Sequence, residues 1–196
     1  MSTRLRIRPA LESEIPLLNT LIEASVQRLQ AEDYSESQRA SALATVFGVD
    51  TQLVRDGTYL VVDVIEARTP EQAAGHVSAK PQIVACGGWS RRKTLFGADQ
   101  WTHREDDLLD PAEDAAKIRA FFIHPDWARR GIGSMLLEAC ETAAKAAGFR
   151  RFEMGATLTG AKLFGARGYI AVKRMSVPLR NGEELPIIHM EKQAEG

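Results

Sequence analysis

The stretch KIRAFFIHPDWARRGIGSMLLEAC, residues 117–140, constrains the fold more than any other part of the chain. Its β-branched and aromatic start predicts a strand that ends at His124 and Pro125. After a turn, apolar residues recur at three- and four-residue steps up to Gly148, which is typical of a helix and its C-terminal glycine. The segment therefore predicts a strand, a tight turn and a long amphipathic helix in direct succession.

The turn at the start of this helix has the chemistry of an anion site. The first amides of a helix lack intrahelical partners, and the helix dipole places partial positive charge there. Gly131 and Gly133 allow a close approach to the backbone, Arg129 and Arg130 add charge, and Ser134 adds a hydroxyl. This pattern indicates a cradle for phosphate or pyrophosphate. An ordinary loop with solvated arginines is the alternative.

Two familiar phosphate motifs are absent from the sequence. The chain has no G-x-x-x-x-G-K-[ST] loop, and the third glycine of a dinucleotide fingerprint is missing near Leu136. The cradle is therefore of neither type.

The remaining patterns predict one α/β (α+β) domain over residues 1–196. The Asn181-Gly182 pair predicts a closing hairpin, and Gly87-Gly88 indicates a bulge or a close backbone approach. Residues 66–81 and 90–116 lack periodicity and are interpreted as insertions, and 69–81 is typical of a mobile loop. We expect strands near 4–8, 57–66, 82–89, 117–125, 149–158, 169–179 and 185–193, and helices near 13–30, 40–47, 126–148 and 159–168.

Composition narrows the class of protein. The formal net charge of −1 gives no reason to expect nucleic acid or an anionic membrane as partner. No apolar run is long enough to span a bilayer, and the N-terminus lacks a secretory pattern, so we expect a soluble, cytoplasmic protein. Cys86 and Cys140 lie far apart and outside any Cys/His cluster, so we expect neither a disulfide nor a metal.

The stretch IRAFFIHPDWARRGIGSMLLEAC resembles the acetyl-CoA-binding core of the GNAT superfamily of N-acetyltransferases. That family has Gln/Arg-x-x-Gly-x-Gly/Ala after a strand ending in a hydrophobic-His-Pro-Asp/Glu-aromatic run. Ala128 stands where the family has Gln or Arg, a mild departure. The order of elements along nearly the whole chain is also similar to the family's. The positions that match the phosphate-binding motif are Arg129, Arg130, Gly131, Ile132, Gly133 and Ser134.

The resemblance implies a mixed central sheet, flanked by helices and splayed between the 117–124 and 151–158 strands. It places the acyl-CoA-binding core at about 117–170, with acetyl-CoA as acyl donor and no metal. Backbone groups of Phe121, Phe122 and Ile123 would bind the pantetheine arm. Those of Phe122 and Ile123 would also polarise the thioester oxygen. The bare sequence allows these residues to be ordinary core strand, and both interpretations hold together because the chemistry uses the backbone.

The implied reaction is direct attack of a primary amine on the thioester, with coenzyme A thiolate as the leaving group. The family's usual acid is a tyrosine in a Phe/Leu-Tyr-x-x-x-Gly-Phe/Tyr pattern, but residues 163–169 read LFGARGY and place Phe164 there. Phe164 would line the cofactor site without donating a proton. Losing general acid assistance, typically worth about 10²–10⁴-fold, slows a reaction without forbidding it. Because position 164 lacks a proton donor, a non-catalytic module that binds or senses acyl-CoA is the alternative function.

No general base is evident in the sequence. Glu153, on the strand beside the splay, is a candidate that would act through water; a surface glutamate paired near Arg151 is the alternative. His189, in the final strand, has no visible partner. The acceptor is a small-molecule or protein amine, and residues 86–104 are expected to help select it. A homodimer is possible because family members often pair.

Overall fold

The computed structural model describes residues 4–65 and 82–194, so the loop expected at 69–81 lies outside the described residues. Seven strands form one sheet in the order β1-β2-β3-β4-β5-β7-β6. All neighbours are antiparallel except β4 and β5, which are parallel. The strands are β1 (Arg4–Pro9), β2 (Tyr59–Ile65), β3 (Gln82–Ser90), β4 (Ala116–Ile123), β5 (Arg151–Thr157), β6 (Ile170–Pro178) and β7 (Glu184–Gln193).

The helices follow local capping signals. Ser35 caps α2 by accepting from the amide of Gln38, so this helix begins earlier than its apolar pattern alone predicted. Asp50 caps α3, a short helix that the sequence patterns missed. The helices are α1 (Ile15–Leu29), α2 (Glu36–Thr45), α3 (Thr51–Arg55), α5 (Ile132–Ala146) and α6 (Leu158–Gly165), with 3₁₀ turns at Glu12–Glu14 and Pro125–Trp127.

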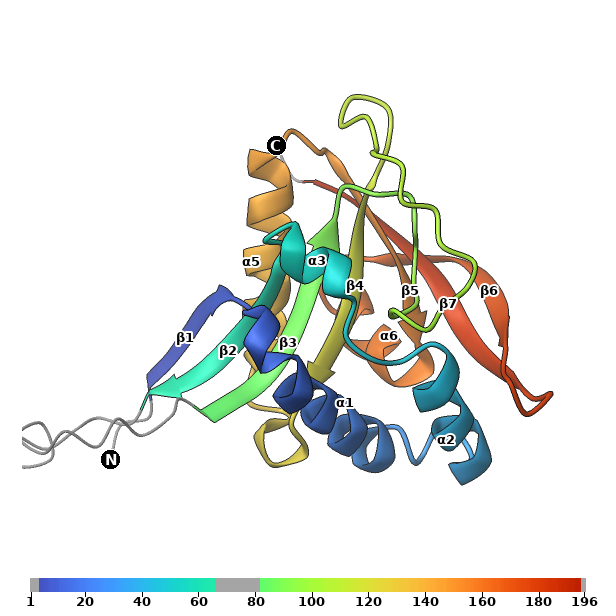
Figure 1. Cartoon of the computed structure of the whole chain (residues 1–196). Coiled ribbons are helices and arrows are strands. Elements are labelled where there is room, and N and C mark those ends of the chain that lie inside the picture. The colour runs from blue at the N-terminus through green and yellow to red at the C-terminus, as the bar shows by residue number, and fades with distance from the viewer. Residues whose placement is uncertain (1–3, 66–81, 195–196) are drawn as a thin grey trace, which may run out of the picture.

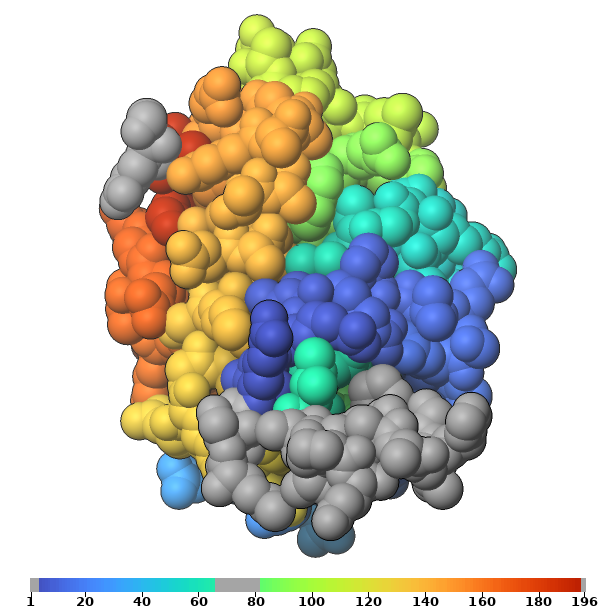
Figure 2. Space-filling model, turned by 90° about the vertical axis from the view of Figure 1, so that its left-hand side faces the viewer, coloured from blue at the N-terminus to red at the C-terminus, as the bar shows by residue number. Residues whose placement is uncertain are grey.

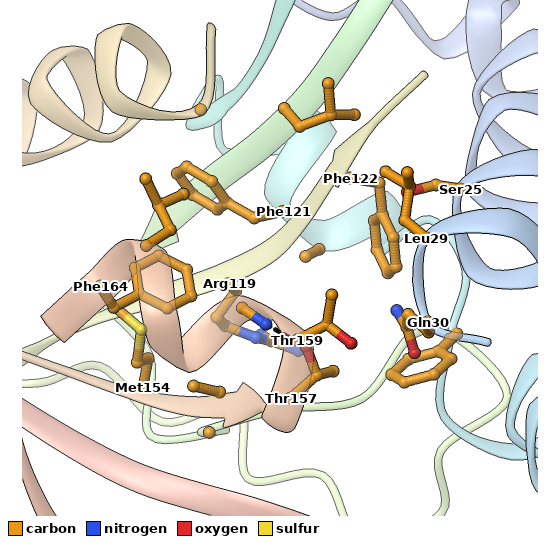
Figure 3. Close-up of a pocket in the computed structure, with 18 of the residues that line it drawn as sticks. Ser25, Leu29, Gln30, Arg119, Phe121, Phe122, Met154, Thr157, Thr159 and Phe164 are labelled. Atoms are coloured by element: carbon orange, nitrogen blue, oxygen red, sulfur yellow. Dashed lines mark hydrogen bonds between the residues drawn. The ribbon is translucent and has the colours of Figure 1, made fainter. Parts of the chain in front are cut away.

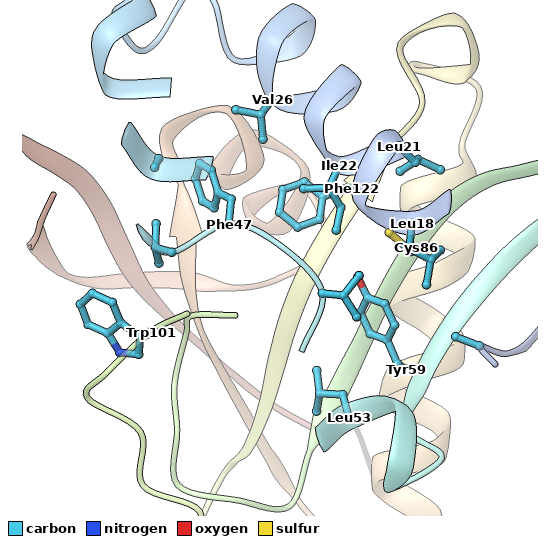
Figure 4. Packing of buried hydrophobic residues seen from close by; sticks show 14 of the residues in the cluster. Leu18, Leu21, Ile22, Val26, Phe47, Leu53, Tyr59, Cys86, Trp101 and Phe122 are labelled. Carbon is cyan, nitrogen blue, oxygen red and sulfur yellow. The ribbon is translucent and has the colours of Figure 1, made fainter. Parts of the chain in front are cut away.

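Helices cover both faces of the sheet (Figure 1). On one face, α1 presents Leu18, Ile22 and Val26 to a core that contains Phe122 and Tyr59 (Figure 4). On the other face, α5 packs its apolar side on β2, β3 and β4 and its opposite side runs along the surface (Figure 2). The α1 and α2 face and the α5 face are therefore separated by the sheet, and a group that serves both must pass through it.

Strand β4 contains a bulge, whereas the sequence signal for it, the Gly87-Gly88 pair, lies in the neighbouring strand β3. Cys86 pairs with Phe122 and Gly88 pairs with Arg119, so Gly87 faces two residues of β4. Ala120, one of these two, has a φ of 56°. A Cβ at Gly87 would lie 2.6 Å from the Phe121 ring, so the missing side chain allows this ring to lie against the backbone of β3. The Gly87-Gly88 pair predicted such a close backbone approach.

Strands β4 and β5 separate soon after they meet. Their pairing is confined to Ala116 with Phe152 and Lys117 with Glu153. Beyond these pairs the two strands diverge, which leaves a gap in the middle of the sheet. The expected splay between the 117–124 and 151–158 strands, and with it the mixed α/β fold, is confirmed.

Candidate active site

A cavity of about 680 Å³ opens at the gap between β4 and β5. Its walls include both strands, the start of α5, the first turns of α6 and the end of α1 (Figure 3). Residues 95–98, from the irregular segment between β3 and β4, also line it. The cavity therefore joins the α5 side of the sheet to the α1 side through the splay.

The turn before α5 has the conformation of an anion cradle. Arg129 and Gly131 adopt left-handed φ values of 63° and 80°. Gly131 is the N-cap of α5, so the amides that follow it are the first of the helix and lack intrahelical partners. Left-handed residues within such a turn direct successive N–H groups into one concavity. Arg130 stacks on the Trp127 ring at 4.9 Å, which orients one of the two expected cations.

Arg167 is a further cation at the cradle. It follows α6, and its Nε donates to the Ser134 hydroxyl at 3.0 Å. The two residues lie 33 positions apart, and no local pattern links them. Lys162, on α6, also lines the cavity. The fold therefore gathers more positive charge around the helix start than Arg129 and Arg130 supply alone.

The bulged end of β4 forms one wall of the gap. Phe121, Phe122 and Ile123 all line the cavity. The Phe122 side chain is buried on the α1 side, whereas Phe121 packs edge-on against Phe164 of α6 with ring centroids 5.9 Å apart. The structure thus brings the expected backbone positions and Phe164 to the same cavity. Phe164 has a purely apolar edge there, and Tyr169 is buried behind it in the core.

The α1 side of the cavity is mixed in polarity. Phe47 and Leu29 supply apolar surface, while Gln30 and Arg119 are polar groups with little exposure (Figure 3). Thr159 Oγ1 donates to Asp33 Oδ2 at 2.6 Å and links α6 to the loop after α1. This half of the cavity has the composition of a binding pocket for a small polar molecule.

The model of the acetyltransferase (GNAT) family matches residues 24–164, which is most of the chain. This chain belongs to the GNAT acetyltransferase family. The matched range includes the turn before α5, the splayed strands and all of α6 except its last residue. No curated protein sequence matches the chain at a significant level.

Solved structures share the fold of this GNAT chain at low sequence identity. A GCN5-related N-acetyltransferase from Rhodopseudomonas palustris has a TM-score of 0.65 and 23% identity, over 98% of each chain. The PaiA N-acetyltransferase of Thermoplasma acidophilum, solved with coenzyme A, has a TM-score of 0.58 and 12% identity, over 98% of this chain and 99% of that one. The putative acetyltransferase YncA of Salmonella typhimurium, solved with acetyl-CoA, has a TM-score of 0.57 and 13% identity, over 97% and 94%.

The residues of this GNAT chain fit a coenzyme A pyrophosphate at the start of α5. A Cβ added to Gly131 meets no atom within 4 Å, so the concavity is open at this point. Gly133 faces Leu163 instead, and a Cβ there would lie 2.9 Å from the Leu163 side chain. The two glycines thus have different tasks: Gly131 keeps the cradle open, and Gly133 lets α6 pack against α5.

Glu153 is not among the residues that line this cavity. Its carboxylate contacts Lys117 through one oxygen and His189 Nε2 at 2.7 Å through the other. His189, for which the sequence showed no partner, therefore has one, and the pairing of Glu153 with Arg151 is not what the structure shows. Ligand atoms of Glu153, His189 and Glu191 lie within 4.8 Å of one another and could hold a metal, but the Lys117 ammonium already neutralises Glu153.

The segment expected to select the acceptor contributes in part. Leu95, Phe96 and Gly97 line the cavity, but Trp101 lies behind them in the core and packs on Phe96. Arg92 pairs with Asp56 at 2.7 Å and does not line the cavity. Both cysteines are buried and burial raises the pKa of each thiol, to about 12 for Cys86, so neither is poised as a nucleophile. Across residues 4–65 and 82–194, no helix is long and apolar enough to cross a membrane.

Proposed function

We propose that this chain, acting as one domain over residues 1–196, transfers the acetyl group of acetyl-CoA to a primary amine. One observation carries the proposal: a single cavity runs from the open turn before α5, past the bulged end of β4, to a pocket of mixed polarity on the α1 side. Donor and acceptor can therefore meet in the gap of the sheet without a covalent enzyme intermediate. Membership of the GNAT family supports the same reaction class.

The residues of the chain would act mainly by binding and orientation. The cradle at Arg129–Ser134 holds the donor's pyrophosphate, with Arg167 as an added counter-charge. Backbone groups at Phe122 and Ile123, where β4 has no partner on its β5 side, orient and polarise the thioester carbonyl. The amine nitrogen then bonds to the carbonyl carbon, the carbon–sulfur bond breaks, and sulfur leaves with the electron pair. The ammonium proton must pass to solvent or to a base before attack, and the nitrogen loses a second proton to solvent or a base as the amide forms.

Proton removal is not assigned to Glu153, because its oxygens contact Lys117 and His189 outside the cavity. Among the described residues that line the cavity, the carboxylates are Glu32 and Asp33, in the loop after α1. A free thiol has a pKa near 8.5, so the thiolate leaves tolerably without an acid at Phe164. We therefore expect slow turnover that rises with pH as the acceptor amine deprotonates.

Phe164 favours a second candidate, a non-catalytic module that binds or senses acyl-CoA. The side chain is buried between Phe121 and Tyr169, and the position offers no hydroxyl to a leaving sulfur. Phe164→Tyr separates the candidates. An enzyme limited by the missing acid gains turnover in this variant, whereas a binding module gains none.

The test combines two independent measurements on the full chain. Titration calorimetry with coenzyme A measures binding, and release of free thiol from acetyl-CoA with a panel of primary amines measures transfer. Binding with amine-dependent thiol release supports the enzyme. Binding with no release above the amine-free background supports the module, and absence of binding refutes both.

A further inference from the structure

Arg119 occupies an unusual position for a charged residue. It lies on β4 immediately before the bulge, lines the cavity, and is only 5% exposed. Figure 3 shows its side chain among the residues around the cavity, between α6 and the end of α1. Arg119 therefore lies in the sheet beside the α1 side of the cavity, which is the half proposed to hold the amine acceptor.

The charge around Arg119 is not balanced inside the protein. Asp50, which is fully buried, lies 2.7 Å from Arg119 Nη2 and 3.1 Å from Arg104 Nη2. One carboxylate thus serves two guanidinium groups. Of these two arginines, Arg104 is the one within ion-pair distance of the Asp106 carboxylate, at 3.4 Å, and the Asp106 side chain is 54% exposed. The buried part of the cluster keeps an excess positive charge next to the cavity.

The hydrogen bonding of Arg119 is incomplete as well. Its Nη2 contacts Asp50 and the carbonyl oxygen of Gly97, whereas its buried Nε has no partner among the described residues. Gln30 Oε1, on another wall of the same cavity, is also buried without a partner there. A buried donor without a partner costs free energy, and native proteins usually retain one for a reason. Burial lowers the pKa of Arg119 against the opposing effect of Asp50, in keeping with a cation short of counter-charge.

A purely structural role does not explain this arrangement. Asp50 already has Arg104 as a partner and caps α3 through the amide of Gln52. An apolar residue at position 119 would remove the charge imbalance and the unpartnered donor together. What Arg119 adds is a buried cation beside the α1 side of the cavity, where the acceptor would lie.

We propose that the amine acceptor of this enzyme carries an anionic group, and that Arg119 binds this group at the inner end of the cavity. The inference rests on the proposed acetyl transfer and narrows its substrate to amino acids or amino phosphates. A small rotation of the guanidinium would bring Nε and a second nitrogen to one carboxylate or phosphate, the paired geometry that arginine favours. Gln30 Oε1 would accept a hydrogen bond from an N–H or O–H group of the same substrate.

The test uses amines matched in size and different in charge. Glycine, β-alanine and 4-aminobutanoate are compared with their amides, and aminoethyl phosphate with ethanolamine, by thiol release from acetyl-CoA. We expect kcat/KM to be about 10- to 100-fold higher for the anionic member of the preferred pair. The two arms distinguish a carboxylate from a phosphate. Arg119→Met should abolish the preference, and Arg119→Lys should retain part of it.

A matched control isolates the cavity. Arg92→Met also removes an arginine from an ion pair, with Asp56, but outside the cavity, and it should keep the full preference. Thermal unfolding of each variant verifies folding, and Arg119→Lys remains informative if Arg119→Met does not fold. Equal turnover of acids and amides by the wild type, or an unchanged preference in Arg119→Met, would overturn the inference.

A binding measurement separates this inference from the proposed reaction. In the presence of coenzyme A, N-acetylglycine and its longer homologues should raise the melting temperature of the wild type more than the corresponding amides do. Arg119→Met should show no such difference. Selective binding without turnover would refute acetyl transfer and leave the anion site standing, whereas turnover without selectivity would refute the anion site alone.

Discussion

Replacing Gly131 by alanine tests the cradle directly, because the chain contains a matched control. Gly131 and Gly182 have nearly equal φ values, 80° and 82°, and a Cβ at either meets no atom within 4 Å. A left-handed alanine costs about 1–2 kcal/mol at either position. For a protein of this size each kcal/mol lowers the melting temperature by about 2–4 °C. Both variants should therefore lose a similar amount of stability.

Only Gly131 lies in the cavity, so only Gly131→Ala should weaken coenzyme A binding. Its Cβ would fill open space that the phosphate needs and would disturb one charge-assisted bond to a backbone amide. Such a bond is worth about 1.5–3 kcal/mol, or about 10- to 100-fold in affinity. Calorimetric titration of both variants with coenzyme A measures the difference. Equal affinities in the two variants, with equal losses of melting temperature, would refute the assignment of the cradle.

Three further outcomes follow from the contacts. Arg167→Ala should weaken coenzyme A binding several-fold at low salt and less at high salt, as titrations at two ionic strengths would show. Gly87→Ala forces a Cβ to 2.6 Å from Phe121 and should cost about 1–3 kcal/mol of unfolding free energy, measured in urea, with turnover reduced. The hydrogen bond from Arg92 lowers the pKa of the Asp56 carboxyl in the folded protein. This pair therefore stabilises the fold above the carboxyl's unfolded pKa, and the stabilisation is lost as pH falls through the lower folded pKa. Melting temperatures of Asp56→Asn should accordingly depend less on pH than those of the wild type below about pH 4.

The cradle could be predicted from the sequence because all its parts are local. A strand, a turn with Gly131 and Gly133, and a helix start lie within a few residues of one another, and backbone amides need no distant partner. The hairpin at Asn181-Gly182 and the glycine pair in β3 were predictable for the same reason: each depends on backbone conformations that favour glycine. Local signals thus located both the turn before α5 and the region of the bulge.

Side-chain partnerships across the fold could not be predicted in this way. Arg167 meets Ser134 only because α6 packs against the start of α5, and His189 meets Glu153 only through the register of β5 with β7. In the sequence, Arg119 is one of two charged residues, with Lys117, in an otherwise apolar strand. Its significance depends on Asp50, which the sequence places in an unremarked turn and the fold buries completely. Register and burial are collective properties, so single-residue patterns miss them.

The bulge in β4 determines which residues of this strand face the cavity on the α1 side. Ala120 is held at a φ of 56°, which costs about 1–2 kcal/mol for a residue with a Cβ. The surrounding contacts offset that cost: Tyr59, fully buried, donates to the Ala120 carbonyl at 3.2 Å, and the bare Cα of Gly87 leaves room for Phe121. Without the extra residue, β4 would keep regular alternation, and the Arg119 and Phe122 side chains, three positions apart, would fall on opposite faces. The bulge instead puts both on the α1 side of the sheet, so the strained residue places the unpaired backbone of β4 beside the part of the cavity where we propose that the amine binds.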